Sequence, residues 1–154
     1  TLKMQRLSHI MKLFYSSDFS INSTKFNLSN TSNILRIICG LFLIPEVFGK
    51  FNGFMQLNPN IVNFFASVGL SPPEFWVYSA ALGELLCGLA LVFGICTRYA
   101  ALGAALILFV AVIALNIVRG YFAWTWSIGG DEYLIFWIIC CCIVALNDFK
   151  ALKK

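Results

Sequence analysis

Four long apolar segments, separated by short polar stretches, make up most of this chain. They cover about residues 32–54, 73–96, 99–118 and 131–146. Apolar segments of roughly this length, with few charges, are typical of helices that cross a lipid bilayer. The pattern therefore predicts an all-α membrane protein, a four-transmembrane-helix bundle without a separate soluble domain.

The first 30 residues differ from the rest because they are basic and polar. Four apolar residues there fall at helical spacing: Leu7, Ile10, Met11 and Phe14. We expect an amphipathic helix on the membrane surface, followed by an irregular linker. The stretch lacks an apolar core followed by a small-residue cleavage site, so the first hydrophobic helix should act as an uncleaved insertion signal. The predicted organisation is a basic amphipathic segment over residues 1–30, the membrane domain over 31–149 and a basic tail over 150–154.

The polar stretch between the first two apolar segments predicts a short outer helix. Asn58 can cap it, Pro59 suits its first position and Gly69 suits its end. Its apolar face consists of Ile61, Phe64, Phe65 and Val68. We expect this helix to lie across the mouth of the bundle.

Two local signals concern the course of the helices. Pro45 cannot donate a hydrogen bond to the carbonyl of Leu41, which predicts a kink in the first helix. Thr97 and Arg98 are expected to form a tight turn between the second and third helices.

Composition supports insertion in a membrane, and the charges orient the bundle. The chain is 60% hydrophobic and 12% charged, whereas a soluble domain is nearer half apolar and a quarter charged. Lysine and arginine favour the cytoplasmic side. With both termini cytoplasmic, that side holds Lys3, Arg6, Lys12, Lys25, Arg36, Arg98, Lys150, Lys153 and Lys154. The other side holds only Lys50 and Arg119, so we expect a multi-pass protein of the bacterial inner membrane. A net charge of +4 gives no case for nucleic-acid binding.

Glu84 is the only charged residue between Phe75 and Thr97. It lies about 16 Å from the start of its helix at about 1.5 Å per residue, which is near the bilayer midplane. A carboxylate at this depth is costly in lipid, so it should face protein, water or a ligand. Small residues share its helix face: Ala80, Ala81, Cys87 and Gly88. They permit close helix packing or leave room for a ligand.

The other polar groups of the helices gather toward the same outer half. They are Glu46 and Lys50 in the first helix, Asn116 and Arg119 in the third, and Asp131 and Glu132 in the fourth. Each also has a structural interpretation. Glu46 and Lys50 can form an ion pair on one helix face, Arg119 can end its helix, and the acidic pair can cap the fourth helix. We expect Lys50 first, and then Arg119, as the partner of Glu84.

The candidate cofactors are few. The sequence has no glycine-rich phosphate loop, and His9 is its only histidine, which excludes haem held by two histidines. Six cysteines lie in or beside apolar segments and are interpreted as packing residues. Copper or zinc could use Cys87 with Glu84, three residues apart on one helix face, but two ligands make a weak signal. Aromatic residues near Tyr121, Trp124 and Trp126 could accept a quinone ring, although aromatic residues are also common at membrane interfaces.

Three segments resemble the DoxX family of small bacterial membrane proteins. They are LRIICGLFLIPEVFGKF, ALGELLCGLALVFGICTR and GGDEYLIFW, and the resemblance covers about residues 33–147. It implicates Arg36, Lys50, Glu84, Thr97, Arg98, Gly130 and Glu132. The family often has a His-Gly pair where this chain has Glu46 and Val47. Family members are associated with a terminal quinol oxidase, thiosulfate:quinone oxidoreductase, redox-stress systems or metal-binding peptides, so the resemblance implies a fold more firmly than an activity.

The leading hypothesis is an accessory protein or subunit in quinone-linked membrane redox chemistry. Glu84, Lys50 and Glu46 are the candidate catalytic residues. Glu84 is the proton acceptor or ligand anchor, with Lys50 and Arg119 as its electrostatic partners. Glu46 could move protons. The candidate ligand-binding residues are Asn116, Arg119, Trp126 and Glu132. No covalent cofactor and no metal are expected, and the expected partners are the bilayer, other membrane subunits or a second copy of the chain. The alternatives are a non-enzymatic assembly partner, with the polar groups as an ion-pair network, and a small transporter or metal-handling protein.

Overall fold

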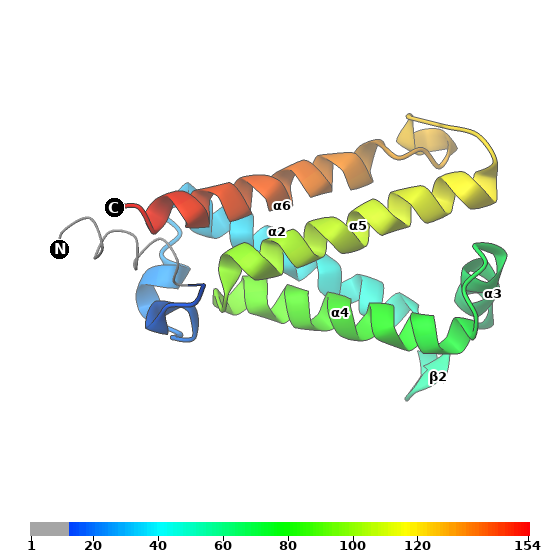
Figure 1. Cartoon of the computed structure of the whole chain (residues 1–154), viewed down its shortest axis with the longest axis horizontal. Helices are drawn as coiled ribbons and strands as arrows, with labels where there is room; N and C mark the ends of the chain where they lie inside the picture. Colours follow the sequence, from blue (N-terminus) through cyan, green and yellow to red (C-terminus); the bar gives the residue numbers. More distant parts are fainter. Residues whose placement is uncertain (1–12) are drawn as a thin grey trace.

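A computed structural model describes residues 13–154, and these residues form the predicted helical bundle (Figure 1). Within this range four helices are long and apolar enough to cross a membrane. They are α2 (Thr31–Gly49), α4 (Pro73–Phe93), α5 (Thr97–Arg119) and α6 (Glu132–Ala151). The prediction of an all-α four-transmembrane-helix protein is confirmed.

The four helices associate mainly as two pairs. Helix α2 packs on α4 and α5 packs on α6, while a further contact between α4 and α5 joins the pairs. Apart from Trp137, the core between them is built from small and medium side chains, among them Cys39, Leu43, Leu91, Ala101, Ala104 and Cys141. Many large apolar side chains point outward instead, for example Phe42, Leu106 and Phe136. This is the arrangement expected where lipid is the solvent and small residues allow helices to approach closely.

The α2–α4 contact depends on two glycines. A Cβ atom added to Gly40 would lie 2.6 Å from the carbonyl oxygen of Gly88, and one added to Gly88 would lie 3.1 Å from the carbonyl oxygen of Gly40. The backbones of the two helices therefore touch at this level, and only glycine fits at Gly40 without displacing the backbone.

Shorter elements close the two ends of the bundle. The turns η1 (Ser16–Asp18) and η2 (Ser23–Phe26) lie at the end where α2 begins and α6 finishes, here called the basic end (Figure 1). The hairpin strands β1 (Phe51–Gly53) and β2 (Gln56–Leu57), helix α3 (Pro59–Ser67) and the turn η3 (Trp126–Ile128) lie at the opposite end, here called the hairpin end.

The outer helix α3 begins and ends where the sequence predicts, so that prediction is confirmed. The Asn58 side chain accepts a hydrogen bond from the backbone N–H of Asn60, and Pro59 occupies the first helical position. The helix stops two residues before Gly69, whose φ of +94° suits glycine. Helix α3 contacts α4, with its predicted apolar face half-buried.

Several predicted helix boundaries are wrong, and α4 ends at Phe93 rather than near residue 96. Helix α2 ends at Gly49 rather than near residue 54, because Phe51 pairs with Leu57 in the hairpin. Thr97 and Arg98 begin α5 instead of forming a turn, since left-handed residues at Gly94 and Cys96 already reverse the chain. Helix α6 continues through its polar end to Ala151.

Two further expectations concern the first helix and the N-terminal segment. Helix α2 runs as one helix through Pro45. The amphipathic helix expected from Leu7, Ile10 and Met11 falls mostly outside the described residues. The expected irregular linker instead contains the two short turns η1 and η2.

Candidate functional site

Glu84 is paired with Lys50 inside the bundle. The Lys50 ammonium donates a hydrogen bond to Glu84 Oε2 at 2.7 Å, and each side chain is 11% exposed. Lys50 is the residue at which α2 ends, and its ammonium also donates to the carbonyl oxygen of Glu46 at 3.2 Å. Glu84 faces inward because it lies on the buried stripe of α4 with Ala81 and Gly88. The expectation that Lys50 is the first partner of Glu84 is confirmed.

Glu46 occupies a different environment from Glu84. Its side chain is exposed on α2, and its carboxylate has no hydrogen bond or ion pair with residues 13–154. Lys50 reaches the backbone carbonyl of Glu46 and not its carboxylate, so the alternative of a Glu46–Lys50 ion pair is wrong. The negative charge of Glu46 nevertheless acts on Glu84 and on Tyr133 of α6.

A second polar cluster links α5 to the start of α6. Asp131 is fully buried; its carboxylate accepts hydrogen bonds from Arg119 at 3.0 Å and from the Asn116 amide at 2.6 Å. Burial opposes ionisation of Asp131, but the hydrogen bonds from Arg119 and Asn116 outweigh it and the pKa of Asp131 falls below its usual value.

This cluster corrects two expectations. Arg119 pairs with Asp131 and not with Glu84. Asp131 occupies the position before α6, but its side chain does not cap that helix, because its carboxylate accepts hydrogen bonds from Asn116 and Arg119 of α5. The polar groups of the hairpin end thus form two separate clusters, where the sequence suggested one.

Glu132 and Trp126 belong to the loop before α6. The backbone N–H of Trp126 donates to Glu132 Oε1 at 3.1 Å, which ties η3 to the first turn of α6. Gly130 is required there, since a Cβ would lie 2.3 Å from the backbone of Trp124. The aromatic side chains considered for a quinone ring, Tyr121, Trp124 and Trp126, are 62%, 49% and 69% exposed.

The basic end contains an ion-pair network that the sequence analysis missed. Arg98 is 1% exposed and binds both carboxylate oxygens of Asp18, at 2.7 and 2.8 Å. Asp148 of α6 accepts a hydrogen bond from the backbone N–H of Arg98 at 3.1 Å. The hydrogen bonds from Arg98 lower the pKa of Asp18. The sequence contains one signal for this network: Asp18 is the only acidic residue before Glu46, in a segment that is otherwise basic.

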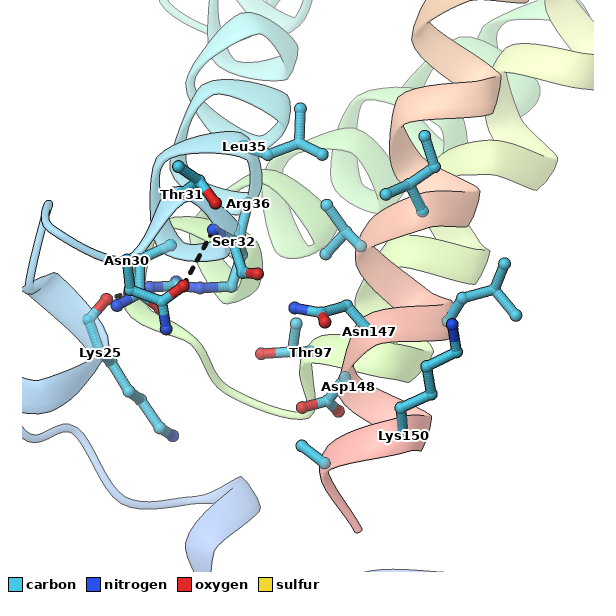
Figure 2. Close-up of a pocket in the computed structure, with 15 residues that line it drawn as sticks. Lys25, Asn30, Thr31, Ser32, Leu35, Arg36, Thr97, Asn147, Asp148 and Lys150 are labelled. Atoms are coloured by element: carbon cyan, nitrogen blue, oxygen red, sulfur yellow. Dashed lines mark hydrogen bonds between the residues drawn. The ribbon is translucent and has the colours of Figure 1, made fainter. Parts of the chain in front are cut away.

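A pocket of about 680 Å³ opens beside this network, between the first turns of α2 and the last turns of α6 (Figure 2). Its polar lining residues include Arg36, Lys25, Thr97, Asn147 and Asp148. It lies at the end opposite to the Lys50–Glu84 pair.

The described residues contain no group of three or more His, Cys, Asp or Glu side chains that could hold a metal ion. The six cysteines are free thiols, with Cys39 and Cys141 buried in the core. The buried carboxylate–ammonium pair at the hairpin end can exchange a proton, bind a polar ligand group or fix α2 against α4.

Comparison with known proteins places the chain in a family. It is 33% identical over 84 residues to "Putative oxidoreductase CatD" of Bacillus subtilis (strain 168), over 54% of this chain and 58% of that protein. The chain thus matches less than two thirds of that relative's length. No solved structure matches the chain. A sequence model of the DoxX family matches residues 32–125, which contain nearly all of α2, the whole of α4 and α5, and the Lys50–Glu84 pair. With this match over more than half of its length, the chain belongs to the DoxX family.

Proposed function

We propose that this protein is an accessory protein or subunit in quinone-linked redox chemistry of the bacterial inner membrane, with Glu84 as its proton site. The observation that carries the proposal is the buried pair of Lys50 and Glu84. In this proposal the basic end faces the cytoplasm, following the distribution of lysine and arginine.

The pair leaves part of Glu84 available. Lys50 binds Oε2, whereas Oε1 has no hydrogen-bond donor among residues 13–154. A carboxylate with one free oxygen can accept a proton or a hydrogen bond from a ligand. Burial favours the protonated form and the adjacent ammonium favours the ionised form, so the two effects oppose each other. Such a balance suits a group that gains and loses a proton at a functional site.

The relative's name supports a redox role without specifying a substrate. Reduction of a quinone to a quinol consumes two electrons and two protons. In the proposed role, a redox-active partner subunit supplies both electrons, protonated Glu84 gives one proton to one quinone oxygen, and water at the hairpin end gives the second proton to the other oxygen and becomes hydroxide. Lys50 then stabilises the carboxylate that remains on Glu84 until it is reprotonated.

Infrared difference spectroscopy tests the proton site. The protein is reconstituted with decylubiquinone, and the quinone is reduced electrochemically, so no partner is needed. We expect reduction to remove a protonated-carboxyl band, and we expect this change to be absent in Glu84→Gln. Glu74→Gln is the matched control, because Glu74 is an exposed carboxylate in the first turn of the same helix. The same change in a folded Glu84→Gln variant, or no binding of the quinone at all, contradicts the proposal.

Assembly of a membrane complex is a second candidate function, and Glu46 favours it. An exposed carboxylate on a membrane-spanning helix is costly in lipid, and a cationic or hydrogen-bonding group of a neighbouring subunit would relieve that cost. Blue-native electrophoresis of solubilised membranes compares the wild type with Glu46→Gln. We expect loss of a high-mass form in the variant and its retention in Glu74→Gln. Identical migration of all three proteins contradicts this function.

A further inference from the structure

The pocket at the basic end contains two cations that form no ion pair with any carboxylate among residues 13–154. Arg36 is 5% exposed and Lys25 is half-buried. The first 12 residues contain no aspartate or glutamate. A buried charge is normally paired, so an unbalanced pair of cations beside a pocket indicates that an anion binds there.

Backbone carbonyl groups hold both cations in place. Arg36 donates to the carbonyl oxygens of Leu91 and Val92 at the end of α4, and to that of Lys25. The Lys25 ammonium donates to the carbonyl oxygens of Ser17, Ser20 and Gly94, the last at 2.6 Å. These bonds fix the positions of the charges without neutralising them, and Asp148 attracts both cations only from beyond ion-pair distance. Burial and the adjacent Arg36 accordingly lower the pKa of Lys25.

Arg36 retains the capacity to bind a ligand. A guanidinium has five N–H groups, and three hydrogen bonds use three of those in Arg36. The remaining two have no acceptor among the described residues. A guanidinium is also the side chain best suited to bind phosphate oxygens.

The rest of the pocket wall favours an anion with an apolar part. Lys150 adds a third cation to the lining. The one carboxylate, that of Asp148, is engaged by the backbone N–H and the guanidinium of Arg98. The lining also contains the apolar side chains of Leu35, Ile143 and Leu146, and the last two are about half exposed on α6.

The depth of the pocket matches that of lipid headgroups. Arg36 is the sixth residue of α2, or about 8 Å from the helix start at about 1.5 Å per residue. We infer that this pocket binds the phosphate of an anionic phospholipid, with Arg36 as the ligand for the phosphate oxygens and the acyl chains lying against the exposed face of α6. The inference concerns the end of the bundle opposite to Glu84 and does not depend on the proposed redox role.

Native mass spectrometry of the delipidated full chain tests this site against added phosphatidylglycerol, phosphatidylcholine and inorganic phosphate. The variant is Ser32→Glu, which places a negative charge on the pocket wall in the first turn of α2, where an anion favours the helix. We expect phosphatidylglycerol to bind more tightly than phosphatidylcholine, and its affinity to fall at least about tenfold in the variant through charge repulsion. Asn60→Glu is the matched control, with the same charge in the first turn of α3 at the hairpin end.

The outcomes separate the sources of the ligand. Binding of phosphatidylglycerol but not of inorganic phosphate supports the phospholipid as the ligand. Binding of inorganic phosphate alone, lost in Ser32→Glu and kept in Asn60→Glu, supports an anion site of the same chemistry with a soluble source. Equal binding of phosphatidylglycerol and phosphatidylcholine, or equal affinity of a folded Ser32→Glu variant and the wild type, overturns the inference. The redox test at Glu84 is unaffected by either result.

Discussion

Lys50 and Glu84 are 34 residues apart in sequence, yet their side chains meet at 2.7 Å and tie the end of α2 to the middle of α4. The contact crosses the helix pair that Gly40 and Gly88 bring into backbone contact. The same two helices thus contribute both the glycine contact and the ion pair. Substitutions at the glycines test the packing, and substitutions at Lys50 or Glu84 test the chemistry.

Removing one member of the Lys50–Glu84 ion pair should destabilise the protein more than removing both charges. In Lys50→Met the Glu84 carboxylate stays buried without its partner, and we expect a loss of about 3 kcal/mol in the free energy of unfolding. Lys50→Met combined with Glu84→Gln should recover part of that loss. Denaturant unfolding in mixed micelles, arranged as a double-mutant cycle, measures the coupling. Additive effects would show that the two side chains are energetically independent.

The glycine contact predicts a packing defect. Gly40→Ala would place a methyl group 2.6 Å from the Gly88 carbonyl oxygen, and we expect a loss of about 1–3 kcal/mol from forced separation of α2 and α4. Gly49→Ala is the control on the same helix, because a Cβ there meets nothing within 4 Å. Thermal unfolding followed by circular dichroism compares the two variants. Equal midpoints for Gly40→Ala and the wild type would contradict a backbone contact at this position.

The Arg98–Asp18 pair should hold the segment before α2 against the bundle. Asp18→Asn leaves the buried Arg98 guanidinium with only part of its counter-charge, and we expect a loss of about 3 kcal/mol. Because residues 13–30 then dock less firmly, limited proteolysis should cut between η1 and α2 faster in the variant. Glu74→Gln, which alters an exposed carboxylate on α4, should be cut at the wild-type rate. Unchanged proteolysis of Asp18→Asn would show that the pair does not anchor this segment.

Acid should weaken both ends of the bundle. The pKa values of Asp18 and Asp131 lie below the usual aspartate value of 3.8 in the folded state. Each ionised group therefore stabilises the fold at pH values above 3.8, and this contribution is lost as the pH falls through the folded-state pKa. Below about pH 4 we expect the midpoint temperature of thermal unfolding to fall as the pH decreases. The fall should be less steep in Asp131→Asn than in the wild type. An equally steep drop in both proteins would contradict the role of Asp131.

The sequence was sufficient for the features that depend on local chemistry. Four apolar segments specify four membrane helices, since backbone polar groups must be satisfied within each segment in lipid. The capping residues Asn58 and Pro59 specified α3 for the same local reason. Glu84 could be placed inside the bundle from its isolation and its small neighbours, and Lys50 was the cation at the matching depth.

Contacts between distant segments were decided only by the tertiary structure. Arg119 could reach either Glu84 or Asp131 as judged by depth, and helix rotation together with the course of the loop before α6 selected Asp131. Arg98 meets Asp18 across 80 residues because the chain before α2 folds back under α5, and this return has no periodic signal. The unbalanced charges of Arg36 and Lys25 likewise emerge only once the carboxylates are seen to be engaged elsewhere. Hydropathy and capping are properties of neighbouring residues, whereas the choice among partners of equal charge is made by the packing of the helices.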